Sequence, residues 1–210
     1  MGIGMVFFGL ELMKDACAHI KDLPAFEAWF GRFSADTVLG MMQCMLTGCI
    51  LTVMVQSSSA TLGITIALAI TGVIDYPTAA ALVLGENIGT TITALLASIG
   101  ANTNARRAAY FHALFNVIGV CWISLFFFGY VQFVPWVIGA DVTEFALDEA
   151  GVKTYTQITA AIAATHSIFN VVNTLLFLPV AHLFAGMLIR IVPERKVREQ
   201  PRLTNLDIRM

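Results

Sequence analysis

The chain has 210 residues, of which 58% are hydrophobic and only 12% are charged, and its mean hydropathy is +0.79. A soluble domain carries about 25% charged residues, so this composition argues against a soluble protein and predicts an all-α membrane protein. The net charge of −2 is uninformative as a total, and we expect no nucleic-acid partner. Its distribution is informative, because charged residues are absent from three long stretches and nearly absent from a fourth, namely 37–74, 108–140, 154–189 and 78–98.

The N-terminal segment Met1–Leu10 lacks a basic region and a small-residue cleavage site, so it is typical of a spanning helix rather than a signal peptide. The cysteines do not form a CxxC pair, and most of them lie in apolar stretches. We interpret them as small buried hydrophobic side chains rather than as a metal or redox site. They are Cys17, Cys44, Cys49 and Cys121.

The stretch Thr37–Ile74 is too long for one straight span. A single helix of its length would extend about 57 Å, whereas the hydrocarbon core is about 30 Å thick. Its centre is the polar tetrad Gln56-Ser57-Ser58-Ser59. We therefore predict a re-entrant helical hairpin that enters from outside and turns at this tetrad. Two full spans are the alternative.

Four successive polar residues at membrane depth are costly unless they are hydrogen-bonded or meet a watery cavity. Ser59 or a neighbour can cap the helix that starts at Ala60-Thr61, and the free N–H groups of such a helix attract an anion. The carbonyl groups of the helix that ends near Val55 suit a small cation. The alternative is that the hydroxyls only bond to neighbouring helices.

A second polar segment, Gly85–Thr93, interrupts the next apolar stretch. Its two glycines, Gly85 and Gly89, predict a transmembrane helix that is broken around Asn87. Glu86 is the only acid in its stretch, and an intramembrane carboxylate is a functional candidate unless it reaches water near a helix end. Because these apolar stretches lack Lys and Arg, a bound anion would need a co-bound cation. The segment also supplies the hydroxyls of Thr90, Thr91 and Thr93.

Two further spans, Ala108–Val134 and Tyr155–Ile189, contain the same H-x-x-F-N pattern. It pairs His112 with Asn116 and His166 with Asn170, and the spacing of four places both side chains on one helix face. We expect these residues to hydrogen-bond across helices, with a role in an ion pathway as the alternative.

The basic residues predict the orientation. Arg106, Arg107 and the tail after Ile189 would lie in the cytoplasm, and the acidic loop near Asp141 outside, by the positive-inside rule. About eight basic residues then lie inside and four outside. This bias predicts a multi-pass protein of the plasma (inner) membrane in one orientation, with its C-terminus in the cytoplasm.

The segments Val55–Thr61 and Leu84–Thr91 resemble the two signature motifs of the type II sodium–phosphate cotransporter family. The ordered continuation through Arg106-Arg107 to Phe115-Asn116 strengthens the resemblance. It implies sodium-coupled phosphate symport, with inorganic phosphate and sodium bound where two inverted repeats converge, and no other cofactor. The candidate ligands for phosphate or sodium, not assigned individually, are Gln56, Ser57, Ser58, Ser59, Thr61, Glu86, Asn87, Thr90 and Thr91.

The chain contains one such set of motifs, and its features look most like the second repeat of bacterial members. We therefore expect residues 1–190 to form one transmembrane repeat and residues 191–210 to be a cytoplasmic linker or tail. The resemblance implies the other repeat, the lipid bilayer and a PhoU-like cytoplasmic domain as its partners. The alternatives are a sodium-coupled carrier of another anion and a non-transporting, phosphate-sensing membrane subunit. No enzyme is expected, because the histidines have no evident nucleophile or metal-ligand cluster beside them.

Overall fold

The computed structural model describes residues 4–5, 8–9, 12, 34–147 and 153–194. These residues form helices joined by turns and loops, and one short antiparallel pair, β1 (Ala146–Leu147) and β2 (Lys153–Thr154). The prediction of an all-α membrane protein is confirmed, since four helical segments are long and apolar enough to cross a membrane. The expected N-terminal helix and residues 195–210 of the tail lie largely or wholly outside the described residues, as does Cys17.

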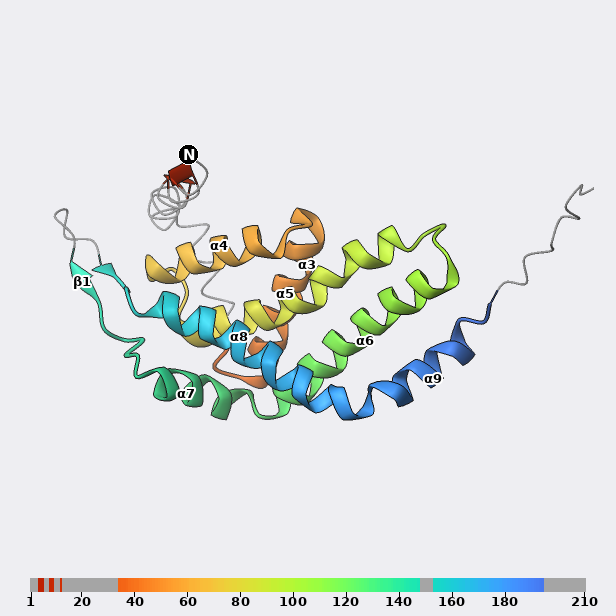
Figure 1. The fold of residues 1–210 in the computed structure, drawn as a ribbon. Coiled ribbons are helices and arrows are strands. Elements are labelled where there is room, and N and C mark those ends of the chain that lie inside the picture. Colours follow the sequence, from red (N-terminus) through yellow and green to blue (C-terminus); the bar gives the residue numbers. More distant parts are fainter. Residues whose placement is uncertain (1–3, 6–7, 10–11, 13–33, 148–152, 195–210) are drawn as a thin grey trace, which may run out of the picture.

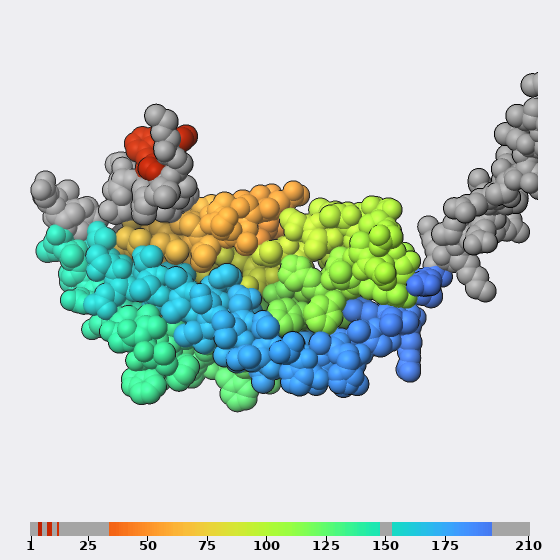
Figure 2. All heavy atoms as spheres, viewed as in Figure 1, coloured from red at the N-terminus to blue at the C-terminus, as the bar shows by residue number. Residues whose placement is uncertain are grey.

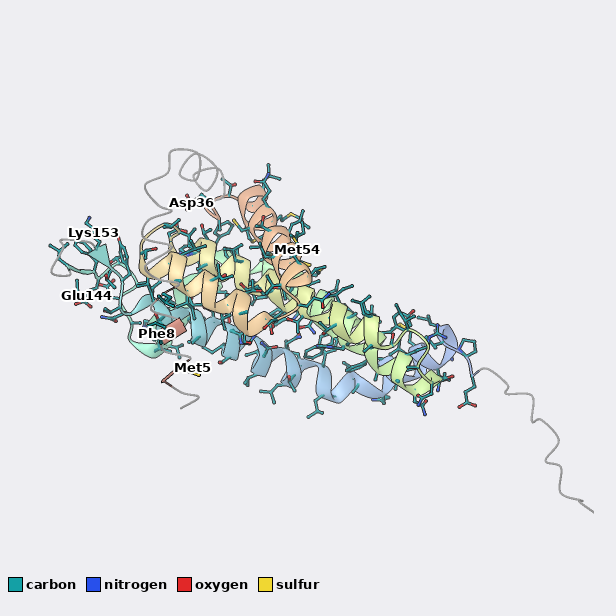
Figure 3. The ribbon with its side chains drawn as sticks, turned by 90° about the horizontal axis from the view of Figure 1, so that it is seen from above. Met5, Phe8, Asp36, Met54, Glu144 and Lys153 are labelled. Carbon is teal, nitrogen blue, oxygen red and sulfur yellow. The ribbon has the colours of Figure 1, made fainter. Side chains whose placement is uncertain are left out.

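The helices α3 (Val38–Val55) and α4 (Ser58–Ile70) form a hairpin, and its turn, Gln56-Ser57, is the first half of the predicted tetrad. Thr37 caps α3, which ends at Gln56 in the left-handed conformation, with a φ of 56°. Met54, in the last turn of α3, is 75% exposed and points away from the helices (Figure 3). The two helices and the turn between them confirm the helical hairpin. Its re-entrant placement in a bilayer stays a prediction.

The helix α5 (Tyr76–Ala97) is continuous, so the predicted break around Asn87 is wrong. The glycines serve a different purpose, which is close contact with α3. A Cβ atom added to Gly85 would lie 1.8 Å from the carbonyl oxygen of Met45, and one added to Gly89 would lie 2.5 Å from that of Cys49. Small residues at helix interfaces let backbones approach in this way. Gly85 and Gly89 therefore bring two helices together without unwinding either one.

The predicted span 108–134 is divided between two helices, α6 (Thr103–Leu125) and α7 (Phe127–Ile138). With 23 residues, α6 is about 35 Å long and is already long enough to cross a bilayer. At Phe126 the chain turns, and α7 packs against α8 (Figure 1). The Tyr130 hydroxyl donates a hydrogen bond of 2.6 Å to the carbonyl oxygen of Thr165 on that helix. This contact is tertiary, and no glycine or proline marks the turn in the sequence.

The last predicted span is also divided. It consists of α8 (Ile158–Phe177), the 3₁₀ turn η1 (Leu178–Val180) and α9 (Ala181–Ile191). Pro179 lies at the junction, where it cannot donate a backbone hydrogen bond. Figure 2 shows α8 and α9 following one another along one long face of the molecule.

The two ends of the molecule differ in charge, as the orientation argument requires. At one end, Arg107 donates through Nε to the carbonyl oxygen of Val192 at 3.0 Å, so α6 begins beside the end of α9. At the other end lie Asp36, Glu144 and Lys153 (Figure 3). Asp141, near Glu144, accepts hydrogen bonds from the hydroxyl and the N–H of Thr143, and these lower the pKa of its carboxyl below the usual value. Which end faces the cytoplasm stays a prediction.

Candidate functional site

The turn between α3 and α4 presents the start of a helix, as the sequence predicted. The cap is Ser57, whose hydroxyl oxygen accepts from the N–H of Ala60 at 3.3 Å. The same hydroxyl lies 3.3 Å from that of Ser59. The remaining free N–H groups of the first turn of α4 and its positive dipole end are therefore available to an anion.

Three helices meet at this turn and enclose a small cavity. Seven residues line it: Ser58, Ser59 and Leu62 from α4, Glu86, Asn87 and Thr90 from α5, and His166 from α8. The cavity measures about 120 Å³, room for several non-hydrogen atoms, since one water occupies about 30 Å³ of liquid. The fold thus brings together five of the nine candidate residues that the sequence predicted.

The turn between α3 and α4 lies beside the middle of α5 and not beside one of its ends. Asn87 follows the N-terminal cap Asp75 by 12 residues, or about 18 Å of helix. The cavity is therefore near the middle of α5.

Glu86 is 3% exposed, and its Oε1 accepts a hydrogen bond of 2.7 Å from the hydroxyl of Thr65 on α4. No basic side chain lies among the described residues that line this cavity, apart from the imidazole of His166. The sequence left open that Glu86 reaches water near a helix end. That alternative is wrong, because Glu86 is buried in the middle of α5. A carboxylate oxygen in such a place is a hard ligand suited to a small cation.

The side chain of Asn87 forms a hydrogen bond with a residue of α8. The amide of Asn170 donates through Nδ2 to Oδ1 of Asn87 at 3.2 Å, and Nδ2 of Asn87 donates to the carbonyl oxygen of Val83 at 2.9 Å. The expected cross-helix bond is thus confirmed for Asn170. The equivalent amide of Asn116 instead donates to the carbonyl oxygen of His112 within its own helix, at 3.0 Å.

Four predicted candidates lie beside the cavity without lining it. Thr61 and Thr91 are buried, and their hydroxyls donate to carbonyl oxygens of their own helices, those of Ser57 and Ile88. Gln56 and Ser57 form the turn itself. Conversely, the prediction omitted Thr65 and Leu62 altogether. It flagged His166 and Asn170 only through the H-x-x-F-N pattern, which does not say which element these residues face.

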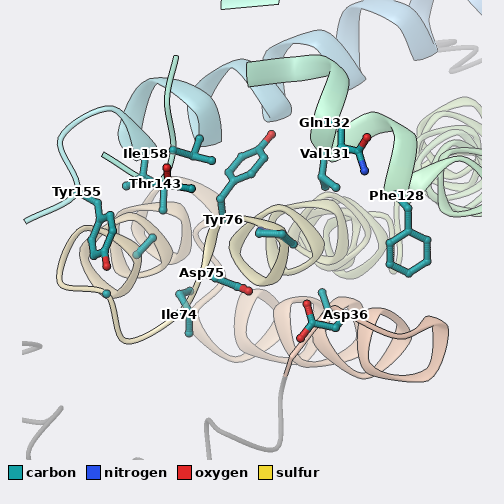
Figure 4. A pocket seen from close by; sticks show the side chains of 15 residues that line it. Asp36, Ile74, Asp75, Tyr76, Phe128, Val131, Gln132, Thr143, Tyr155 and Ile158 are labelled. Atoms are coloured by element: carbon teal, nitrogen blue, oxygen red, sulfur yellow. The ribbon is translucent and has the colours of Figure 1, made fainter. Parts of the chain in front are cut away.

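A second cavity, of about 600 Å³, lies at the acidic end (Figure 4). Asp36 and Asp75 line it, with apolar side chains and the ring of Tyr76. Both carboxylates have structural partners. Asp75 accepts from the N–H of Thr78 at 3.0 Å, and Asp36 accepts from the hydroxyl of Ser34. This cavity is larger, but the concentration of polar groups at the helix turn makes the small cavity the better candidate.

Comparison with known proteins agrees with the sequence motifs. Relatives include the uncharacterized protein YqeW of Bacillus subtilis, 29% identical over 93% of this chain and 57% of its own length. The putative inorganic phosphate export protein YjbB of Escherichia coli is 28% identical over 99% of this chain and 35% of its own length. The mouse sodium-dependent phosphate transport protein 2C is 41% identical over 36% of this chain and 13% of its own length.

The chain spans between about a third and somewhat more than half of the length of the bacterial relatives it matches. No solved structure matches. The model of the Na⁺/Pi-cotransporter family matches residues 23–199, which is most of the chain. The chain therefore belongs to the Na⁺/Pi-cotransporter family.

Proposed function

We propose that this chain supplies one half of the binding site of a sodium-coupled phosphate transporter of the plasma membrane. The observation that carries the proposal is the small cavity, where the start of α4 faces a buried carboxylate on α5. Phosphate would bind at the N–H groups and hydroxyls of the α4 turn. Sodium would bind near Glu86 and the polar groups around it.

The electrostatics of the cavity explain why the two ions would bind together. A phosphate next to Glu86 would be repelled, and the described residues around the cavity include no Lys or Arg to offset the repulsion. A sodium ion between the two negative groups offsets it, so each ion raises the affinity for the other. Half-helices that meet near the midplane bind substrate and coupling ion in this way in other secondary transporters.

The family is one of transporters and not of enzymes. The Escherichia coli relative is named for putative phosphate export, whereas the name of the mouse relative gives sodium-dependent phosphate transport and no direction. A coupled carrier runs in the direction that its ion gradients favour. We therefore propose that the sodium gradient, and not the site, decides the direction for this chain.

Uptake of radiolabelled phosphate into proteoliposomes tests the proposal, with an inward sodium gradient compared against potassium. Co-expression of this chain with a first-repeat half of the family should give sodium-driven uptake. Reversing the gradient should give efflux. Because the basic residues favour one orientation, two copies of this chain cannot form the inverted pair, so the chain alone should give none.

The two alternatives have distinct outcomes in this assay. Stronger competition by sulfate or a carboxylate than by unlabelled phosphate would indicate a carrier of another anion. Sodium-dependent phosphate binding without flux in the co-expressed preparation would indicate a sensing subunit. Uptake that is equal with sodium and potassium would contradict sodium coupling. Robust uptake by the chain alone would contradict the proposal that the chain supplies only half of the binding site.

A further inference from the structure

His166 is the cavity-lining residue that the proposed function leaves without a role. It belongs to α8 and lines the cavity together with Ser58 and Ser59 at the start of α4 and Glu86 on α5. Its ring makes no hydrogen bond to any other residue that the structure describes. Its backbone carbonyl oxygen accepts from Nδ2 of Asn170 at 2.8 Å, and Asn170 also bonds to Asn87. The histidine is therefore held at the cavity while its imidazole stays available.

The partners of Glu86 show which roles remain for the imidazole of His166. The carboxylate of Glu86 bonds to Thr65, and no hydrogen bond or ion pair joins it to His166. The cavity of about 120 Å³ lies between them. This arrangement suits two ligands of opposite charge, with a cation beside Glu86 and an anion beside the imidazole.

We propose that His166 is a direct ligand of the transported anion, with a ring N–H group that donates a hydrogen bond to a phosphate oxygen. This inference rests on the proposed function and assigns a residue of α8 to the anion. The other donors at this place come from α4 and α5: hydroxyls, backbone N–H groups and the amide of Asn87. The imidazole is a lining group whose ring nitrogens bond to no other described residue, so its N–H group is available to a ligand. The site is thereby completed across two elements that are about 100 residues apart in the sequence.

The chain contains a matched control. His112 belongs to the same H-x-x-F-N pattern, and its carbonyl oxygen also accepts from an asparagine four residues later. It lines a different cavity, at the contact of α5 and α6, whose other residues are mainly alanines. The two histidines thus share their local helical setting and differ in what they face.

The test uses the co-expressed preparation and measures phosphate binding by calorimetry in sodium. The His166→Ala variant should bind phosphate at least about tenfold more weakly, because a hydrogen bond to a charged ligand is lost. The His166→Gln variant keeps an N–H donor and should lose less. The His112→Ala variant should bind like the unmodified protein. Normal phosphate binding by His166→Ala would overturn the role of His166 and leave the proposed function standing.

A second measurement needs no variant. Diethylpyrocarbonate modifies accessible imidazoles, and peptide mapping resolves the four histidines of the chain. Phosphate with sodium should protect His166 and leave His112 unprotected, and chloride with sodium should protect neither. Equal modification of His166 with and without phosphate would overturn the inference. If the unmodified protein binds no phosphate in calorimetry, the proposed function falls, and the role of His166 falls with it.

Discussion

At the scale of single residues, Gln56 combines an unfavourable backbone with a polar side chain at the turn. Its φ of 56° makes it the one non-glycine residue with positive φ in the described part of the chain. Glycine is the usual residue at such a helix end, because the left-handed conformation costs other residues about 1–2 kcal/mol. A strained backbone beside a candidate site motivates the hypothesis that the side chain of Gln56 contributes to binding.

The Gln56→Gly variant should therefore change stability and binding in opposite directions. Its free energy of unfolding should rise by about 1 kcal/mol, because the strain is removed. Its affinity for phosphate in sodium should fall, because the amide is lost. Thermal unfolding in detergent and calorimetry measure the two effects. Unchanged affinity would show that the amide of Gln56 does not contribute to the site.

Ser58 tests whether the tetrad binds the anion or only joins helices. It lines the cavity, so Ser58→Ala should abolish sodium-dependent phosphate binding while the thermal midpoint stays close to that of the unmodified protein. Thr93→Ala is the control, since Thr93 is exposed and its hydroxyl bonds only to the carbonyl oxygen of Thr90. Normal binding by Ser58→Ala would assign the tetrad to helix contacts.

Thr65 is the structural partner of the buried carboxylate. The Thr65→Val variant removes the donor to Oε1 of Glu86, and loss of a partner by a buried polar group costs about 1–3 kcal/mol. Thr47→Val, whose hydroxyl is exposed and bonds within its own helix, should cost little. Adding Glu86→Ala, which removes the acceptor, completes a double-mutant cycle on unfolding. Additive effects in that cycle would show that the two side chains are not coupled.

At the scale of elements, the contact between α3 and α5 depends on glycines. A Cβ atom at Gly85 would overlap the carbonyl oxygen of Met45, so one of the two backbones would have to shift. Overpacking of this kind costs about 1–3 kcal/mol. Gly85→Ala should therefore lower the free energy of unfolding by at least that amount, as measured by thermal unfolding in detergent.

Gly129 on α7 provides the matched control for this prediction. A Cβ atom there would meet nothing within 4 Å. Gly129→Ala should be neutral or stabilising, because alanine favours a helix over glycine by about 1 kcal/mol. If the two variants had equal stability, the close approach of α3 and α5 would not matter for folding.

At the scale of the whole molecule, the charge distribution predicts one orientation. Asn104 lies at the start of α6, beside the basic end, and Glu144 lies at the acidic end. In a background without the four native cysteines, Asn104→Cys should react with an impermeant reagent only from the cytoplasmic face. Glu144→Cys should react only from the outer face. Labelling of both from one face would contradict the topology, which has an odd number of membrane crossings between the two positions. Labelling of each from both faces would indicate dual orientation.

The sequence by itself determined the class of the protein, the hairpin and most of the polar cluster. These features are local. Long charge-free stretches indicate membrane helices, and the polar tetrad in the middle of one such stretch predicted a turn followed by a capped helix, which the structure contains. Five of the nine proposed ligands consequently line one cavity. The family also followed from motifs that are contiguous in the sequence.

Only the tertiary structure decided the features that depend on a neighbouring helix. Gly85 and Gly89 permit either unwinding or close packing, and the position of α3 selected packing. The turn at Phe126 follows from the contact of α7 with α8, for which the sequence carries no local signal. The patterns around His112 and His166 are alike, yet only His166 faces the cavity, because helix packing and not spacing sets which face meets α4 and α5.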